Sequence, residues 1–245
     1  MTTTIIYESR GKAKEYSELA ANLYGGCDHG CIYCYAPSAT FKKREVFHVP
    51  WVRKNVLNKF EKDCIELRNA GETRPVLLSF TTDPYQHLDV TEKLTRRAIQ
   101  LLHKNRLSVV ILTKGGKRSE RDFGLLMDHP ELSQYGATLV FTDETMRKEI
   151  EPNAAPTKER IESLELAHSM GISTFVSMEP VWDPAQSLEL IEQTVDFVDF
   201  YKVGKLNYFP VAKTVDWKKF GHDAVQLLEK HDKEYYIKKD LAVLM

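Results

Sequence analysis

Apolar runs recur along the chain and predict strands that are buried on both faces. They occupy residues 75–80, 107–113, 137–142, 172–178 and 197–203. Continuous apolar runs of this length are typical of strands in a parallel sheet that is covered by helices. A further strand is expected to end within residues 17–26, and residues 234–239 are a candidate for a closing strand.

Helices are expected between these runs, at residues 51–69, 91–105, 157–170, 184–194 and 217–230. Thr91, Thr157 and Asp183 stand at the beginnings of three of them, where a side-chain oxygen can cap the first turn. Strands that alternate with helices pair in parallel through right-handed crossovers. The pattern therefore predicts an α/β fold, either a barrel or an open doubly wound sheet.

Unusual polar stretches begin where the apolar runs stop. They are the segment from Cys27 to Cys34 and the stretches TTDPYQ, TKGGKR, TDET and MEPVWD. The carboxyl ends of parallel strands lie at one rim, where barrels and open α/β sheets both carry their chemistry. We therefore expect these stretches to form one site.

Composition narrows the classes of protein to consider. The 245 residues carry a net charge of −1, so no bulk positive field marks a nucleic-acid binder. The chain has no apolar stretch of about eighteen residues and no apolar run after the opening MTTTIIYESRGK, so we expect a cytoplasmic protein without a membrane span. The basic groups FKKRE and KGGKR are interpreted as solvated lysines, with phosphate contact as the alternative.

Three of the four cysteines lie in the segment GGCDHGCIYCYA, residues 25–36. In a reducing compartment, such clustering more often marks a metal or redox site than a disulfide. Structural zinc needs four ligands, whereas three thiolates can hold three irons of a [4Fe-4S] cluster and leave the fourth iron open to a small ligand. Gly25, Gly26 and Gly30 permit the tight turns of such a loop.

A second interpretation of the cysteines stays open from the residues alone. A zinc loop could be completed by His29, His48 or Cys64, although His29 lies inside the triplet and Cys64 is expected on the buried side of a helix. The protein would then be a non-catalytic module that holds zinc or a closed iron-sulfur cluster.

The spacing CxxxCxxC, with the aromatic Tyr33 just before the last cysteine, resembles the signature of the radical S-adenosylmethionine (radical SAM) superfamily. The segments TTDPYQHLD, ILTKGGKRSERD and SMEPV are similar, in order, to the branch that contains spore photoproduct lyase, over roughly residues 18–182. The resemblance implies one domain over residues 1–245, with a partial (β/α) barrel of about six parallel strands at about 18–204. A short N-terminal piece and a C-terminal extension, residues 205–245, would flank this core.

The resemblance also implies the cofactors. Cys27, Cys31 and Cys34 would bind a [4Fe-4S] cluster, whose open iron chelates the amino and carboxylate groups of S-adenosylmethionine. An electron from a flavodoxin or ferredoxin-type donor would then cleave the sulfonium bond. The products are methionine and a 5′-deoxyadenosyl radical, which abstracts hydrogen from the substrate.

Contacts to S-adenosylmethionine are carried over from the same resemblance. Tyr33 would lie near the adenine, and Tyr35 near the cofactor. Thr81, Thr82 and Asp83 offer hydroxyls and a carboxylate to its ammonium group. The alternatives are ordinary packing for the two tyrosines and a capping role in a proline turn for Asp83.

Further candidates follow the later apolar runs. Lys114 would neutralise the carboxylate of S-adenosylmethionine, aided by the hydroxyl of Thr142. Arg160 and Glu179 would contact its ribose or carboxylate, with a plain salt bridge as the alternative for each.

The substrate is not fixed by these motifs. Spore photoproduct lyase carries a cysteine at the second strand end, where this chain has Phe80, so we do not assign that reaction. Lys202, Lys205 and Asn207 are substrate contacts by position alone, and Tyr85 is a candidate hydrogen relay. A nucleic acid is one candidate substrate, by analogy with the branch.

Overall fold

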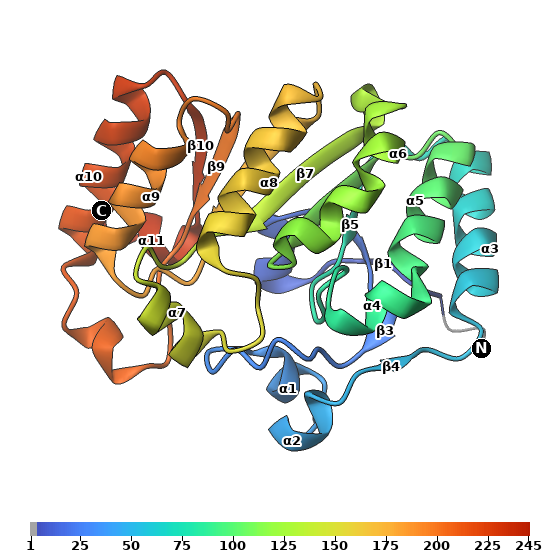
Figure 1. The fold of residues 1–245 in the computed structure, drawn as a ribbon, viewed down its shortest axis with the longest axis horizontal. Coiled ribbons are helices and arrows are strands. Elements are labelled where there is room, and N and C mark those ends of the chain that lie inside the picture. The colour runs from blue at the N-terminus through green and yellow to red at the C-terminus, as the bar shows by residue number, and fades with distance from the viewer. Residues whose placement is uncertain (1–3) are drawn as a thin grey trace.

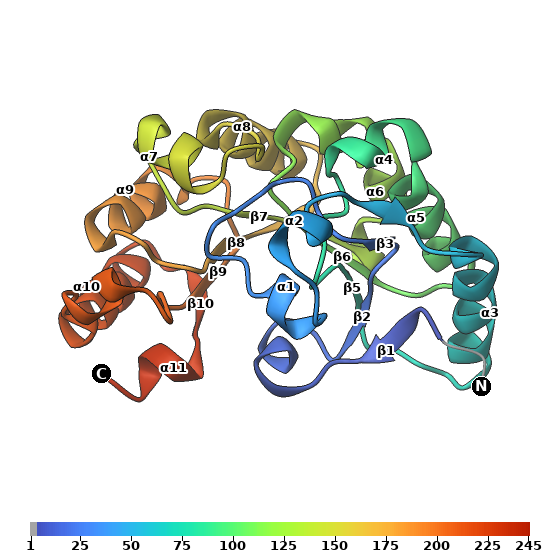
Figure 2. The ribbon, with the colours of Figure 1, turned by 90° about the horizontal axis from the view of Figure 1, so that it is seen from below.

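The computed structural model describes residues 4–245, which are built around one eight-stranded sheet. The strand order is β1-β2-β5-β6-β7-β8-β9-β10, as Figure 1 and Figure 2 show. Neighbouring strands from β2 to β10 are parallel, whereas β1 runs antiparallel to β2. The strands are β1 (Ile6–Glu8), β2 (Leu19–Ala21), β5 (Val76–Leu78), β6 (Val109–Thr113), β7 (Ser133–Thr138), β8 (Ser173–Met178), β9 (Phe200–Val203) and β10 (Glu234–Ile237).

Helices form an arc around one face of this sheet (Figure 2). The main ones are α3 (Val56–Asn69), α5 (Leu94–Lys104), α6 (Phe123–Met127), α8 (Thr157–Ser169), α9 (Pro184–Thr194) and α10 (Trp217–Lys230). The strands coil inside the arc and leave the opposite side open. The predicted α/β fold with a partial (β/α) barrel is thereby confirmed, and β10 adds a parallel strand from the C-terminal extension.

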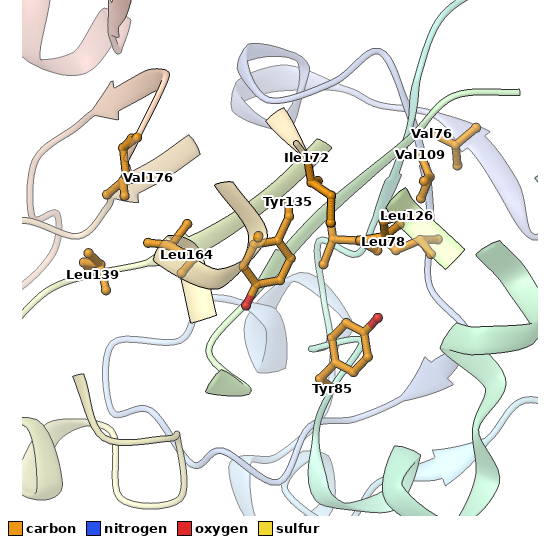
Figure 3. Close-up of a cluster of buried hydrophobic side chains, with 14 of the residues drawn as sticks. Val76, Leu78, Tyr85, Val109, Leu126, Tyr135, Leu139, Leu164, Ile172 and Val176 are labelled. Carbon is orange, nitrogen blue, oxygen red and sulfur yellow. The ribbon is translucent and has the colours of Figure 1, made fainter. Parts of the chain in front are cut away.

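The main apolar core lies between the sheet and the helices, as the cluster in Figure 3 shows. Residues two apart on a strand face the same side, so Val76 and Leu78 of β5 both belong to this core. Leu77, Val110 and Phe175 face the other way and form a smaller cluster inside the barrel. The strands are therefore apolar on both faces, which is why they read as continuous runs in the sequence.

Strand β7 occupies Ser133–Thr138, earlier than the predicted residues 137–142. Parallel pairing with β6 sets this register, with Ser133 opposite Val109. The apolar residues 139–141 are buried, but they lie in the loop that leads to α7 (Glu144–Ile150). The apolar pattern at residues 139–141 therefore indicates burial, although these residues are not part of the sheet.

Two predicted helices also have different boundaries. Residues Trp51–Val52 form strand β4 against β3 (Tyr24–Gly25), so α3 begins only after Asn55, whose φ of 55° is left-handed. The predicted helix 91–105 is interrupted by Lys93, whose φ is 52°. It divides into α4 (His87–Glu92) and α5.

Gly136 on β7 lets the ring of Phe175 lie directly on the sheet, since a Cβ at position 136 would stand 2.3 Å from that ring. We expect Gly136→Ala to lower the free energy of unfolding by about 1–3 kcal/mol, because the ring has to move within a packed interior. Urea denaturation measures this loss.

The matched control is Gly124→Ala on α6, where a Cβ meets nothing within 4 Å. Alanine at this helical position should leave stability unchanged or raise it by about 0.5–1 kcal/mol. Equal unfolding free energies for Gly136→Ala and the unaltered protein would contradict the packing account.

Candidate active site at the carboxyl ends of the strands

A cavity of about 470 Å³ opens at the carboxyl ends of the strands. It has the size of a small-molecule or cofactor site. Most of the predicted site residues line it, namely Cys27, Cys31, Tyr33, Cys34, Tyr35, Thr81, Thr82, Asp83, Lys114 and Glu179. Segments far apart in the sequence are thus brought to one place, as the parallel topology requires.

The three cysteines lie in the loop between β3 and α1 (Ala36–Ala39), which crosses the open side of the strands in Figure 2. Gly26 and Gly30 have left-handed φ values of 83° and 69°, as expected of the glycines in this loop. A Cβ on Gly26 would stand 2.3 Å from the carbonyl oxygen of Phe47. The approach of these two chain segments therefore depends on glycine at position 26.

The segment after α1 holds the backbone of this loop in place. The amide of Cys27 donates to the carbonyl of Phe47 at 3.0 Å. The guanidinium of Arg44 donates to the carbonyls of Cys31 and Cys34 at 3.2 and 3.0 Å. His48 Nδ1 lies 3.0 Å from the carbonyl of Cys27. These bonds use main-chain atoms and leave the three sulfur atoms to the cavity.

The cysteine sulfurs are free thiols in a desolvated setting. Burial raises the pKa of Cys31 to about 12 and raises the pKa of Cys27 and of Cys34 as well. A cation that binds these sulfurs must therefore displace their protons, and its binding will release protons to the solvent.

Behind the cysteine loop, a buried ion pair supports Tyr33. The Tyr33 hydroxyl donates to the carboxylate of Glu151, which also pairs with Arg160 at 2.6 Å. Arg160 is completely buried and donates further to the carbonyls of Ala155 and Thr138. Burial would raise the pKa of Glu151, but Arg160, Lys114 and the Tyr33 hydroxyl together hold it below its usual value. The Glu151–Arg160 pair therefore holds the hydroxyl of Tyr33 in place.

Lys114 presents a cation to the cavity. Its ammonium lies 5.6 Å from the centre of the Tyr33 ring, and within residues 4–245 it makes no hydrogen bond or ion pair. Burial would lower the pKa of Lys114, but the neighbouring Cys31 and Glu151 raise it by more. A charged amine thus lies at the cavity wall with its donors free for an anionic ligand.

Asp83 is committed to protein partners. It accepts hydrogen bonds from the Thr113 hydroxyl at 2.6 Å and from the amides of Lys114 and Tyr85 at 2.7 and 2.8 Å. His29 Nδ1 lies 3.5 Å away. Burial would raise the pKa of Asp83, but His29 and these hydrogen bonds hold it below its usual value. The carboxylate therefore ties the strand ends of β5 and β6 together. Its bond from the amide of Tyr85 is the local turn contact that a capping role would make.

Another part of the cavity lining brings together Tyr16 and Lys238, which lie near opposite ends of the sequence. The Tyr16 hydroxyl lies 2.6 Å from Ser177 Oγ and donates to Glu179 at 2.9 Å. Lys238 makes an ion pair with the same carboxylate. The sequence does not point to Tyr16 and Lys238, because neither belongs to a motif at a strand end. They come close to Glu179 only when the chain is folded.

Two predicted contacts, Thr142 and Arg160, lie outside the cavity lining. The Thr142 hydroxyl donates to Glu189 of α9 at 2.8 Å, because β7 ends earlier than predicted and Thr138 takes the position at the strand end. Arg160 acts on the site through Glu151. Its guanidinium is used entirely inside the protein, so it is a positioning residue rather than a ligand contact.

Of the residues suggested as substrate contacts by their position in the sequence, only some line the cavity. Lys205 and Asn207 line the cavity. The ammonium of Lys202 instead donates to the carbonyls of Glu15 and Tyr16. Tyr85 is buried in the core beside the cavity lining and does not reach the cavity, so the suggestion that it relays hydrogen loses its geometric basis.

Each of the three residues that would complete a zinc loop has other contacts in the protein. Cys64 lies on α3 and is buried in the core, and His48 Nδ1 lies 3.0 Å from the backbone carbonyl of Cys27. His29 stands between Asp83 and Arg118, and burial lowers its pKa to about 4. In the described part of the chain, no three His, Cys, Asp or Glu side chains converge on a position for one metal ion.

Fold and site together define an α/β partial barrel with a three-thiol loop at the carboxyl ends of its strands. A family model described as the Radical SAM superfamily matches residues 21–198. The chain belongs to this superfamily. Its members are enzymes that generally use a [4Fe-4S] cluster and S-adenosylmethionine, and the reaction of this chain is unassigned.

Two similar chains are described as uncharacterized proteins. A protein of Methanocaldococcus jannaschii is 27% identical over 187 residues, which cover 76% of this chain and 69% of the relative. A protein of Acidianus two-tailed virus is 26% identical over 205 residues, which cover 78% of this chain and 65% of the relative.

Solved structures agree on the fold. Spore photoproduct lyase complexed with dinucleoside spore photoproduct has a TM-score of 0.73 at 14% identity, over 94% of this chain and 78% of that chain. SuiB of Streptococcus suis bound to S-adenosylmethionine has a TM-score of 0.66 at 11% identity, over 89% and 49%. These likenesses establish the barrel architecture. As for membranes, none of the helices within residues 4–245 is both long and apolar enough to span one.

We expect Arg160→Met to destabilise the protein by about 3–5 kcal/mol, because it leaves the carboxylate of Glu151 buried without a counterion. The double variant Glu151→Gln/Arg160→Met should recover much of this loss, since no buried charge remains at the pair. Urea unfolding of the two single variants and the double variant measures the coupling. Additive losses would show that the pair does not act as a unit.

Proposed function

We propose that the chain is a radical SAM enzyme that holds a [4Fe-4S] cluster through Cys27, Cys31 and Cys34 and binds S-adenosylmethionine beside it. One observation carries this proposal: the three thiols and the unpaired ammonium of Lys114 line the same cavity. Three thiolates suit a cluster, because each can bind a different iron and none has to converge with the others on one ion. The contacts of His29 with Asp83 and Arg118, the contact of His48 with the backbone of Cys27 and the burial of Cys64 in the core argue against the zinc alternative.

The bound cofactors would supply a one-electron cleavage of the sulfonium bond and a 5′-deoxyadenosyl radical that abstracts hydrogen from a substrate. The residues of the chain itself bind and orient S-adenosylmethionine. Lys114 provides the cation for the carboxylate of S-adenosylmethionine, and Thr81 and Thr82 offer hydroxyls to its ammonium. Tyr33, fixed by Glu151, supplies an aromatic face.

The substrate would meet the opposite side of the cavity. Phe80 lines the cavity with its ring edge-on to Tyr16, at 6.1 Å between centres. Among the described residues that follow β5, position 80 therefore offers an aromatic ring where spore photoproduct lyase has a thiol. The reaction of spore photoproduct lyase is therefore not proposed. Arg10, Lys205 and the exposed ring of Tyr208 also line the cavity, which suits a phosphate-bearing aromatic substrate such as a nucleic acid.

The iron content of cysteine variants tests the cluster. Reconstitution without oxygen should give about four irons per chain in the unaltered protein and in Cys64→Ala. Cys27→Ala, Cys31→Ala and Cys34→Ala should each lose the cluster, because each removes one of three ligands. The loaded protein should also form 5′-deoxyadenosine from S-adenosylmethionine when dithionite is added. A colourless protein with one zinc, or loss of iron in Cys64→Ala, would refute the assignment.

Lys114→Met should weaken the binding of S-adenosylmethionine about tenfold or more, because it removes a charge-assisted contact to the carboxylate. Lys117→Met is the matched control, since Lys117 lies in the same segment but is solvent-exposed and paired with Glu162. Equilibrium binding to the reconstituted protein gives both dissociation constants. Equal affinity in the two variants would exclude Lys114 from the site.

A further inference from the structure

The segment of residues 41–54, which we call the α2 surface, projects from the barrel. It contains α2 (Arg44–Phe47) and β4 and lies below the sheet in Figure 1, apart from the arc of helices. Five of its apolar side chains are exposed: Phe41 (98% exposed), Val46, Val49, Trp51 and Val52. Several exposed apolar side chains in one short segment are typical of an interaction site.

The α2 surface is also basic, although the whole chain carries a net charge of −1. It carries the positive residues Lys42, Lys43, Arg44, Arg53 and Lys54, against the single acid Glu45. The ammonium of Lys42 lies 4.8 Å from the centre of the Trp51 ring. Within residues 4–245, Lys42, Lys43 and Lys54 form no ion pair, so their charge is available to an acidic partner.

This surface is bonded directly to the cysteine loop. Arg44 donates to the carbonyls of Cys31 and Cys34, and His48 meets the carbonyl of Cys27. Among the described residues, none of residues 41–54 lines the cavity. The cysteine loop therefore lies between the cavity, which would hold the small molecules, and an exposed basic and apolar surface.

We propose that the α2 surface docks an acidic one-electron carrier protein, with a flavin or an iron-sulfur centre, that reduces the cluster. This inference rests on the proposed function. In the step, one electron passes from the carrier to the cluster, so the carrier is oxidised by one electron and the cluster is reduced by one. No bond forms or breaks. A small interface with charged and apolar contacts is typical of transient redox encounters.

A nucleic acid is also acidic, but the geometry favours the carrier. A nucleotide that reacts has to enter the cavity. The cations of the cavity, Arg10, Lys12, Lys114, Lys205 and Lys238, all come from other segments. The α2 surface contacts the backbone of all three cysteines instead. A partner on this surface is therefore placed for exchange with the cluster rather than for delivery of a substrate.

Charge reversal tests the surface by a direct binding measurement. Lys42→Glu/Lys43→Glu should weaken the binding of an acidic flavodoxin about tenfold or more at low salt, both before and after iron is loaded. The control is Lys218→Glu/Lys230→Glu, two exposed lysines at the ends of α10, which should bind flavodoxin as the unaltered protein does. If the unaltered protein binds neither flavodoxin nor an acidic ferredoxin, or if both double variants lose affinity equally, the proposal is wrong.

Turnover separates this proposal from the proposed function. With reduced flavodoxin, cleavage of S-adenosylmethionine by Lys42→Glu/Lys43→Glu should be slower about tenfold or more, whereas with dithionite its rate should match that of the unaltered protein. Equal loss with both reductants would overturn the docking site. Absence of cleavage with dithionite in the unaltered protein would instead refute the proposed function. Loss of single-stranded DNA binding with unchanged flavodoxin affinity would assign the surface to a nucleic acid and also overturn the proposal.

Discussion

Parallel pairing of the strands is the constraint on which the site depends. Seven strands in succession run the same way, so their carboxyl ends meet at one edge. Asp83 follows β5, Lys114 follows β6, Thr138 ends β7 and Glu179 follows β8, and all four line one cavity. The hydrogen bonds of Asp83 to Thr113 and to the amide of Lys114 lock two of these strand ends together.

The carboxylates in and near the cavity have ion-pair or hydrogen-bond partners within the protein. Glu151 has Arg160, Asp83 has three hydrogen bonds, and Glu179 has Lys238. Unpaired charge is costly away from water, so these groups are held in fixed positions. Lys114 differs, since in residues 4–245 its ammonium has neighbours of opposite charge but no hydrogen-bond partner. The donors of Lys114 are therefore available to an anionic ligand.

The sequence predicted those features that depend on residues close together in the chain. The apolar runs located the inner strands, and the cysteine spacing located the loop, because both depend on residues that are close in sequence. The register of β7 was misplaced because residues 139–141 are as buried as the strand itself. Thr142 was consequently assigned to a position that Thr138 occupies.

Tyr16, Glu151 and Lys238 were missed for a different reason. Each acts on a partner that lies far away in the chain, such as Tyr33 for Glu151 and Glu179 for Tyr16. The role of residues 41–54 could not be foreseen either. Their basic residues looked like an ordinary solvated group until the fold showed Arg44 and His48 against the cysteine loop.

The central claim is that three cysteine ligands leave one iron open to S-adenosylmethionine. The most direct measurement is electron-nuclear double resonance on the reduced cluster, with S-adenosylmethionine that carries ¹⁵N in its amino group and ¹⁷O in its carboxylate. We expect magnetic coupling of both labels to the cluster, because both groups would bind the open iron. Bound S-adenosylmethionine that shows no coupling from either label would contradict the claim.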